Sequence, residues 1–201
     1  MARAFAKIAF TESVKAVQAR YGSRNAYAKF DLDDNNRDYL SDFEARFLAE
    51  RDSFYLGSVS ENGWPYIQHR GGPKGFIKML DNKTIGFADF RGNKQYISVG
   101  NLSADNRVFL FFMDYPNRKR LKIWARAKIV YEEEDAKLIA RLALPAYPAK
   151  VEQGIIMTIE ALDWNCPQHI TPRYSKADVE QLIAPLQAEI LALKTQLASK
   201  Q

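Results

Sequence analysis

Alternating apolar and polar residues dominate the centre of the chain and predict a series of short β-strands. The segments "FYLGSV" (54–59) and "WPYIQHR" (64–70) have strand character, with β-branched and aromatic residues at spaced positions. Between them, Asn62 and Gly63 form a dipeptide that favours the tight turn of a β-hairpin. The two segments are therefore predicted to pair as antiparallel strands.

Five further segments extend this pattern and set the fold class. "RVFLFFM" is apolar throughout, which predicts a strand buried on both faces, whereas "RLKIWARAKIV" alternates almost perfectly. Six or seven strands at short spacing, with few helices between them, favour an antiparallel barrel over a parallel sheet. The five segments span residues 76–80, 84–89, 107–113, 120–130 and 154–162.

Helix signals flank the strands. Thr11 is a candidate N-cap for a short helix that Gly22 ends. Ser41 and Glu44 have the spacing of a capping box and precede an apolar helical face. Residues 132–144 begin with four acids, which suit the positive end of a helix dipole.

The C-terminal segment, residues 177–199, has a different periodicity. Its apolar residues recur at intervals of four and three, which is the seam of a coiled coil, and Pro185 is expected to kink or break the helix. A seam this narrow suits a partner helix, and the alternative is a helix that lies back on its own barrel. The seam residues are Val179, Ile183, Leu186, Ile190, Leu193 and Leu197.

These patterns divide the chain into three parts. Residues 1–39 form a helical lead-in that ends in the polar, turn-rich segment 29–39. Residues 40–175 form the barrel domain, and residues 176–201 form the heptad helix.

Composition narrows the class of protein. Hydrophobic residues make up 47% of the 201 residues and charged residues 26%, the balance of an ordinary globular domain with one core. No apolar run approaches the roughly 18 residues of a membrane span, and the N-terminus lacks the apolar stretch of a signal peptide. Cys166 is the single cysteine, so no internal disulfide can form, and a reducing, cytoplasmic location is expected.

The sequence lacks the motifs that mark several common kinds of active site. It contains no Gly-x-Ser-x-Gly elbow, no Gly-x-Gly-x-x-Gly fingerprint and no phosphate-binding Gly-Lys-Ser/Thr motif. Cys166 and His169 form a Cys-x-x-His pair, but only His69 and scattered carboxylates remain to complete a metal site. We therefore expect no structural zinc.

An anion site has more support from the residues. Arg91, Gly92, Asn93 and Lys94 form a loop after an apolar strand, while Arg70 ends one strand and Arg120 begins another. In a simple meander these strands would be neighbours, so the three cations of Arg70, Lys94 and Arg120 would converge on a phosphate monoester. The alternative is that each is a solvated charge at a strand end.

The sequence resembles a known family at these residues. "ERDSFYLGSVSENGWPYIQHRGGPKGF", "GFADFRGNKQYISVGNL", "NRVFLFFMDYPNRKRLKIWARAKIV" and "DWNCPQHI" are similar to the pyridoxamine 5′-phosphate oxidase-like proteins, which have an FMN-binding split barrel. The likeness covers residues 40–175 and is greatest to a bacterial subgroup of flavin-binding proteins related to that oxidase.

The resemblance implies a six-stranded antiparallel split β-barrel with flanking helices. It also implies a homodimer with FMN sites at the interface. The residues that it maps onto the FMN site are Gln68, His69, Arg70, Gly71, Phe87, Ala88, Arg91, Asn93, Lys94, Gln95 and Arg120.

The chain departs from the family pattern at two places. Asn93 stands where the family has an arginine of the phosphate pair, and Arg91 is the candidate replacement. The Arg-Leu-His-Asp-Arg-like ending of the true oxidase is absent, so oxidation of pyridoxamine phosphate is not expected. The family's C-terminal tryptophan and arginine map loosely onto Trp164 and Arg173.

Three functions follow as hypotheses. The first is an FMN-dependent oxidoreductase that acts on a small substrate, with NAD(P)H as a candidate electron donor. The second is a flavin carrier or sensor without turnover. The third is a nucleic-acid binder that uses the basic stripe 118–128, which the net charge of +5 would assist, although its lysines and arginines are spread along the whole chain. FAD, a deazaflavin or haem are alternative ligands for the same fold.

Trp124 lies within the basic stripe. It is expected to be exposed and to contact a partner subunit.

Overall fold

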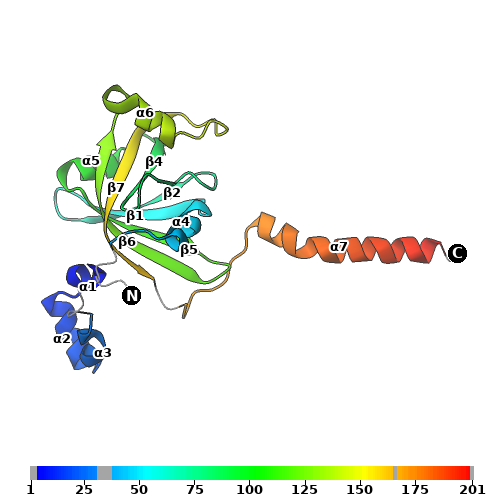
Figure 1. Cartoon of the computed structure of the whole chain (residues 1–201), viewed down its shortest axis with the longest axis horizontal. Helices are drawn as coiled ribbons and strands as arrows, with labels where there is room; N and C mark the ends of the chain where they lie inside the picture. The colour runs from blue at the N-terminus through cyan, green and yellow to red at the C-terminus, as the bar shows by residue number, and fades with distance from the viewer. Residues whose placement is uncertain (1–3, 31–37, 165–166, 200–201) are drawn as a thin grey trace. The chain divides into compact units, whose positions relative to one another are not determined.

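The computed structural model describes residues 4–30, 38–164 and 167–199. These residues form two compact units. The first unit contains the described parts of residues 1–113 and 120–166, and the second contains residues 114–119 and the described residues from 167 onward. Figure 1 labels the helices and all strands except β3.

The first unit is built on an antiparallel seven-stranded sheet with the order β2-β1-β5-β6-β7-β4-β3. The sequence predicted strands of this kind, and the hairpin through Gly63 is confirmed, with registered pairs running from Ser53↔Gly71 to Val59↔Pro65. The strands are β1 (Ser53–Val59), β2 (Pro65–Gly71), β3 (Lys78–Met79), β4 (Thr84–Phe90), β5 (Arg107–Asp114), β6 (Lys119–Val130) and β7 (Val151–Trp164).

Side-chain contacts show that the sheet closes on itself. β2 and β4 are separated by four strands in the sheet order, yet the guanidinium of Arg70 on β2 lies 2.6 Å from the carboxylate of Asp89 on β4. The rings of Phe54 and Phe87 also meet inside, with centroids 5.4 Å apart. This is the predicted split barrel, and it has seven strands rather than six because the short β3 pairs with β4.

The helices confirm the sequence signals. Thr11 caps α2, Gly22 follows it with a φ of +73°, and Ser41 caps α4 in a capping box with Glu44. The helices are α1 (Ala4–Ala9), α2 (Glu12–Arg20), α3 (Arg24–Ala28), α4 (Asp42–Ala49), α5 (Ile97–Ala104), α6 (Glu132–Leu142) and α7 (Lys176–Ala198). Among the described residues, no helix has the length and apolar character needed to cross a membrane.

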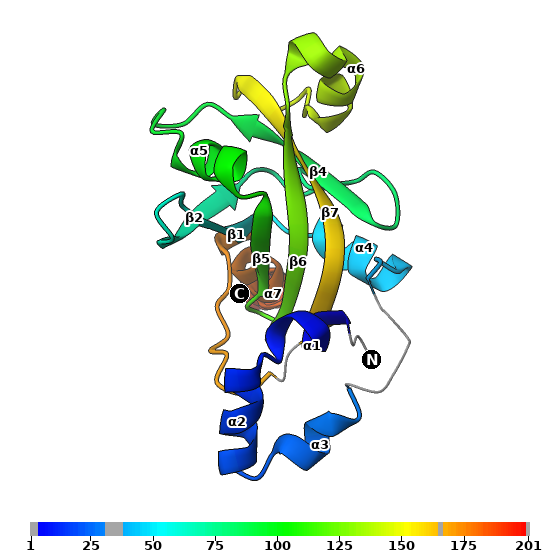
Figure 2. The same ribbon diagram turned by 90° about the vertical axis from the view of Figure 1, so that its left-hand side faces the viewer.

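Two expectations about burial are wrong. In β5 only alternate residues, Val108, Leu110, Phe112 and Asp114, are buried, because alternate side chains of a strand face opposite sides of the sheet. Trp124 on β6 is half-buried rather than exposed, because the ring of Phe5 from α1 stacks on it, with the ring centroids 6.1 Å apart. Helix α1 packs against β7 at the end of the sheet seen at the bottom of Figure 2.

Two of the six cations of the basic stripe 118–128 are paired with acids across the sheet. Lys122 Nζ lies 2.5 Å from Asp163 Oδ2, and Arg126 Nε lies 2.6 Å from Glu160 Oε1. Both acids are on β7. The sequence showed the cations as one run but gave no sign that acids of another strand face them. This pairing weakens the stripe as an electrostatic surface for nucleic acid.

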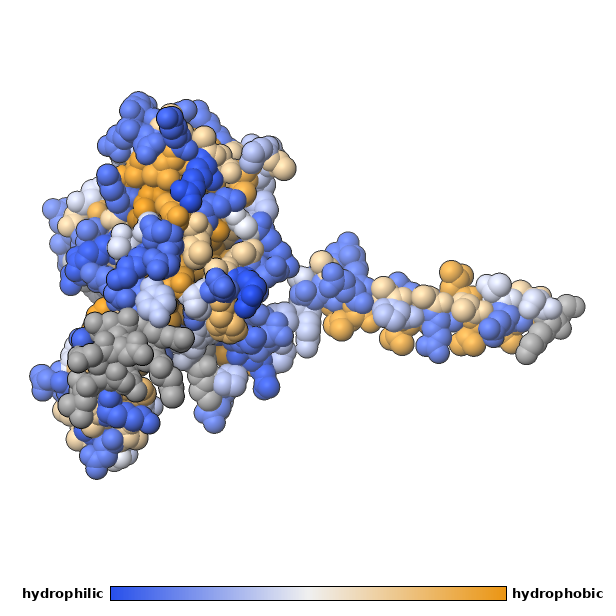
Figure 3. Space-filling view, in the orientation of Figure 1, coloured by the Kyte–Doolittle hydropathy of each residue, from blue (hydrophilic) through white to orange (hydrophobic). Residues whose placement is uncertain are grey.

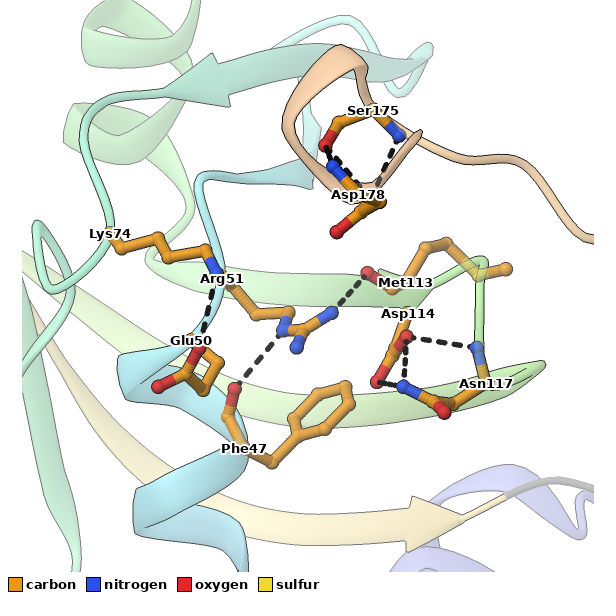
Figure 4. A network of polar contacts seen from close by, with 9 residues as sticks. All are labelled: Phe47, Glu50, Arg51, Lys74, Met113, Asp114, Asn117, Ser175 and Asp178. Carbon is orange, nitrogen blue, oxygen red and sulfur yellow. Dashed lines mark hydrogen bonds and ion pairs between the residues drawn. The ribbon is translucent and has the colours of Figure 1, made fainter. Parts of the chain in front are cut away.

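Helix α4 is joined to the barrel by Trp164 and Arg51. The indole Nε1 of Trp164 donates a hydrogen bond to buried Glu44, at 2.9 Å. The guanidinium of Arg51 donates to the carbonyl oxygens of Phe47 and Met113, at 3.1 and 3.2 Å, and so ties the end of α4 to β5 (Figure 4). Trp164, onto which the family's C-terminal tryptophan maps loosely, therefore contacts residues of α4 in this structure.

The second unit contains a turn and helix α7. Asp114 accepts a hydrogen bond from the backbone of Asn117, and Ser175 forms a capping box with Asp178 at the start of α7 (Figure 4). The guanidinium of Arg173 lies 5.0 Å from the centre of the Tyr115 ring. Helix α7 continues through Pro185, so of the predicted kink or break the break does not occur.

The Glu44 contacts predict a pH-dependent effect of Trp164→Phe. Burial raises the pKa of Glu44, but hydrogen bonds from Ser41 and Trp164 outweigh it, so the pKa lies below its ordinary value of 4.5. The substitution should reduce the free energy of unfolding by about 1.5–3 kcal/mol at neutral pH, because a buried carboxylate loses a donor. Urea unfolding measures the difference.

The sign of the pH dependence follows from linkage. A carboxylate with a lowered folded pKa stabilises the protein above its unfolded pKa of 4.5, and this contribution disappears as pH falls through the folded value. The deficit of Trp164→Phe should therefore shrink in acid. A deficit that is the same at all pH values, or that is undiminished in a Glu44→Met background, which offers no oxygen acceptor, would contradict this assignment.

Candidate functional site

A cavity of about 270 Å³ opens where β2, the end of β4 and the start of α5 meet. A second cavity of about 190 Å³ adjoins it, and both are lined by Gln68, Arg70, Asp89, Phe90 and Gly92. We refer to the two cavities together as the cleft. It lies beside the Arg70–Asp89 contact that closes the barrel.

Most of the site residues predicted from the sequence line the cleft. The larger cavity includes Gln68, Arg70, Asn93, Lys94 and Gln95. The smaller cavity adds the remaining strand residues, which are His69, Gly71, Phe87 and Ala88.

The loop from β4 to α5 has an unusual backbone. Asn93 Oδ1 accepts a hydrogen bond from the backbone N–H of Gln95, at 3.1 Å, in the manner of an Asx turn. Lys94 and Tyr96 then adopt left-handed conformations, with φ of +60° and +53°. Such conformations cost free energy for residues other than glycine and are concentrated at ligand sites. The loop is therefore held in a specific shape beside the cavity.

Helix α5 directs its N-terminal end at the larger cavity. Ile97, Ser98 and Val99, its first three residues, all line it. The first N–H groups of a helix have no intrahelical acceptor, and the end that carries them is electropositive. Ser98 Oγ also donates to Gln68 Oε1, at 2.5 Å, which fixes this glutamine against the helix.

Arg70 is held by a buried network that the sequence analysis missed. Its Nη1 donates to Asp89 Oδ1 at 2.6 Å, and Gln153 Nε2 donates to Asp89 Oδ2 at 2.9 Å. Its Nε is buried and has no hydrogen-bond partner among the described residues. The signal that was available is Asp89 itself, a carboxylate inside an otherwise apolar strand.

Glu152 on β7 is a second residue that the sequence analysis missed. Arg91 Nε donates to it at 2.8 Å and the Tyr96 hydroxyl donates at 3.3 Å. The hydrogen bond from Arg91 holds the pKa of Glu152 below its ordinary value, while desolvation and this carboxylate raise the pKa of Tyr96. Arg91 thus forms an ion pair with Glu152, and it lines neither cavity.

The predicted convergence of Arg120 with Arg70 and Lys94 is wrong within one chain. Two strands separate β6 from β2, so the simple meander does not hold. Arg120 also precedes Leu121, which is fully buried, and alternate residues face opposite sides. The guanidinium of Arg120 therefore lies on the outer face, 5.2 Å from the centre of the Phe111 ring.

The charges that line the larger cavity are balanced. Arg70 and Lys94 are cationic, and Asp89 and Glu152 are anionic. Asp89 is paired with Arg70 and Glu152 with Arg91, whereas Lys94 forms no ion pair within the part of the chain that the structure describes. Lys94 and the start of α5 are thus the groups best placed to meet an added anion.

The histidine and cysteine hypotheses add little to this site. The ring of His69 lies against that of Tyr55, with centroids 5.7 Å apart. His169 lies in the second unit, and Cys166 is outside the described residues.

Comparison with known proteins identifies a family. The sequence profile described as "Pyridoxamine 5'-phosphate oxidase" matches residues 40–161, which is more than half of the chain. A search of curated proteins gives no significant match.

Solved structures share the fold at low sequence identity. HupZ of Group A Streptococcus is 15% identical, with 67% of this chain and 100% of that chain covered and a TM-score of 0.51. An FMN-binding protein from Syntrophomonas wolfei is 16% identical, with 62% and 85% covered and a TM-score of 0.45. At these identities the likeness to HupZ shows the fold alone.

The Arg70–Asp89 pair should contribute strongly to stability. Asp89→Asn leaves a buried guanidinium without its counter-ion and should lower the free energy of unfolding by about 3 kcal/mol or more. Arg70→Gln combined with Asp89→Asn should cost less than the sum of the single changes. Urea unfolding of the four proteins of the cycle measures this coupling.

The matched control is the exposed pair of Lys74 and Glu50, with 67% and 62% of their side chains accessible. Glu50→Gln should change stability by no more than about 1 kcal/mol. Strict additivity of the two changes at Arg70 and Asp89 would show that the buried contact does not close the barrel as described.

Proposed function

Since the chain belongs to the pyridoxamine 5′-phosphate oxidase family, we propose that it binds FMN in the cleft and acts as an FMN-dependent oxidoreductase on a small substrate. The observation that carries this proposal is the meeting of Lys94, the left-handed loop and the start of α5 at one cavity. These groups supply positive charge and N–H donors, and Lys94 forms no direct ion pair with any described residue, although its charge helps to lower the pKa of nearby Glu152.

The phosphate of FMN would lie in the larger cavity. Lys94 offers a point charge, and the first N–H groups of α5 offer donors at an electropositive helix end. Arg70 can add its buried Nε, which has no partner among the described residues. Asp89 already neutralises the arginine, so Lys94 carries most of the charge recognition.

The flavin ring would lie toward the smaller cavity. Phe76, Phe87 and Ala88 give this cavity an apolar wall, and Gln68 and His69 give it polar groups. Ser98 fixes the Gln68 amide, which can then orient a polar ring edge. When bound, the flavin supplies the redox chemistry, and these residues bind it, orient it and exclude water.

A homodimer completes the proposal. Ile67 is 70% exposed on β2, and half-buried Phe111 on β5 lies beneath the Arg120 guanidinium. Arg120 Nε is buried without a hydrogen-bond partner among the described residues. A second barrel on this outer face would cover the apolar side chains and bring Arg120 toward the flavin of the other subunit.

Lys94→Ala tests the phosphate site. It should weaken FMN binding about 10- to 100-fold, because one charge-assisted hydrogen bond contributes about 1.5–3 kcal/mol. Riboflavin lacks the phosphate, so its affinity should change little. Titration followed by flavin fluorescence measures both ligands.

The control for this variant is Lys137→Ala on α6, an exposed lysine that lines neither cavity. It should leave both affinities unchanged. If Lys94→Ala and Lys137→Ala bind FMN equally well, the loop is not the phosphate site.

Anaerobic addition of NADPH or NADH separates an oxidoreductase from a flavin carrier. For an oxidoreductase that uses a nicotinamide donor, the flavin absorption of the FMN-loaded protein should bleach with saturable kinetics. Free FMN at the same concentration is the control. A flavin band that persists with both nicotinamides would contradict this electron donor and favour the carrier.

A further inference from the structure

Helix α7 carries an apolar seam that its own unit does not cover. The helix contains no buried residue, and its six seam residues are 38–66% exposed. Hydrophobic residues are visible at intervals along α7 in Figure 3. The seam residues are Val179, Ile183, Leu186, Ile190, Leu193 and Leu197.

The spacing assigns each seam residue a heptad position. Ile183 and Ile190 occupy successive a positions, and Leu186 and Leu193 occupy the d positions that follow them. Isoleucine at a with leucine at d favours a parallel pair of helices over trimers and tetramers. The four central layers therefore favour a single partner helix, while Val179 and Leu197 occupy the flanking d and a positions.

Charges beside the seam agree with a parallel arrangement. Glu189 occupies a g position and Lys194 the following e position. In a parallel pair each g residue faces the following e residue of the other helix, so glutamate meets lysine on both flanks. In an antiparallel pair with all six layers matched, Glu189 would instead face its own counterpart.

Pro185 is compatible with this pairing. It occupies a c position, away from the seam, and α7 is helical on both sides of it. Its ring removes one backbone hydrogen bond from the helix without removing a side chain from a layer.

We propose that α7 pairs with the α7 of a second copy of this chain to form a parallel two-stranded coiled coil. The pairing is independent of flavin binding, because none of its residues lines the cleft. Six of the eight valine, isoleucine and leucine residues of α7 lie at a and d, with Leu182 at g and Leu191 at b, so most of its apolar surface forms a stripe narrower than the face of a helix that packs on a globular surface. This favours a second helix over the chain's own barrel as the occupant.

Cysteine crosslinking of the full-length chain tests the proposal. In a Cys166→Ser background, Leu193→Cys places a thiol at d, and Leu191→Cys places one at a b position that is 67% exposed. In a glutathione buffer the disulfide-linked dimer at 193 should exceed that at 191 by about tenfold or more, since only paired d positions bring the Cβ atoms within bonding range. Equal crosslinking at the two positions overturns the proposal even if the barrels dimerise.

Charge exchange tests the orientation. In the Leu193→Cys chain, Glu189→Lys should reduce crosslinking because lysine then faces Lys194, and adding Lys194→Glu should restore it. In an antiparallel pair the double exchange would place two glutamates, at 180 and 194, on one flank. Failure of the double exchange to restore crosslinking therefore overturns the parallel arrangement.

Discussion

The contact between Arg70 and Asp89 is the constraint on which the site depends. β2 and β4 do not pair through their backbones, so side chains must hold this side of the barrel together. Both groups of the pair are largely buried, and Gln153 satisfies the second carboxylate oxygen. An ion pair of this kind is costly to break, because either partner alone would be an uncompensated buried charge. Closing the barrel here also places the cleft between the end of β4 and the start of α5.

The same contact determines how the cleft can recognise an anion. Arg70 is positioned firmly, but Asp89 offsets its charge, and the Glu152 carboxylate is offset by Arg91. The groups left to meet a phosphate are Lys94 and the helix end, which depend on the left-handed loop. The proposed FMN site therefore relies on backbone shape more than on a cluster of cations. Its strain is consistent with a loop that is held in place for binding.

Local features of the sequence predicted much of the fold. The Asn62–Gly63 turn, the caps at Thr11 and Ser41 and the alternation in β6 each depend on neighbouring residues, and each is confirmed. The seven-stranded order could not be derived this way, because it depends on pairings between distant segments. The resemblance to a split-barrel family supplied the barrel architecture but not the strand order, and the assumed meander misplaced Arg120.

The site was predictable in its residue types but not in its electrostatics. Residues of the loop 92–95 line the cleft as expected, whereas Glu152 is 61 positions from Arg91 and gave no local signal. The outward position of Arg120 could have been inferred, since it directly precedes an apolar residue of an alternating strand. The acids of β7 that pair with cations of β6 could not be predicted either, because they too are distant in sequence from their partners.

The most direct test of the central claim is an absorption spectrum of the purified full-length protein, recorded after incubation with excess FMN and exhaustive dialysis. If FMN binds in the cleft, a flavin band should stay with the protein and be shifted relative to free FMN. A protein that remains colourless after this treatment would contradict FMN binding in the cleft and leave only the split-barrel fold and family standing.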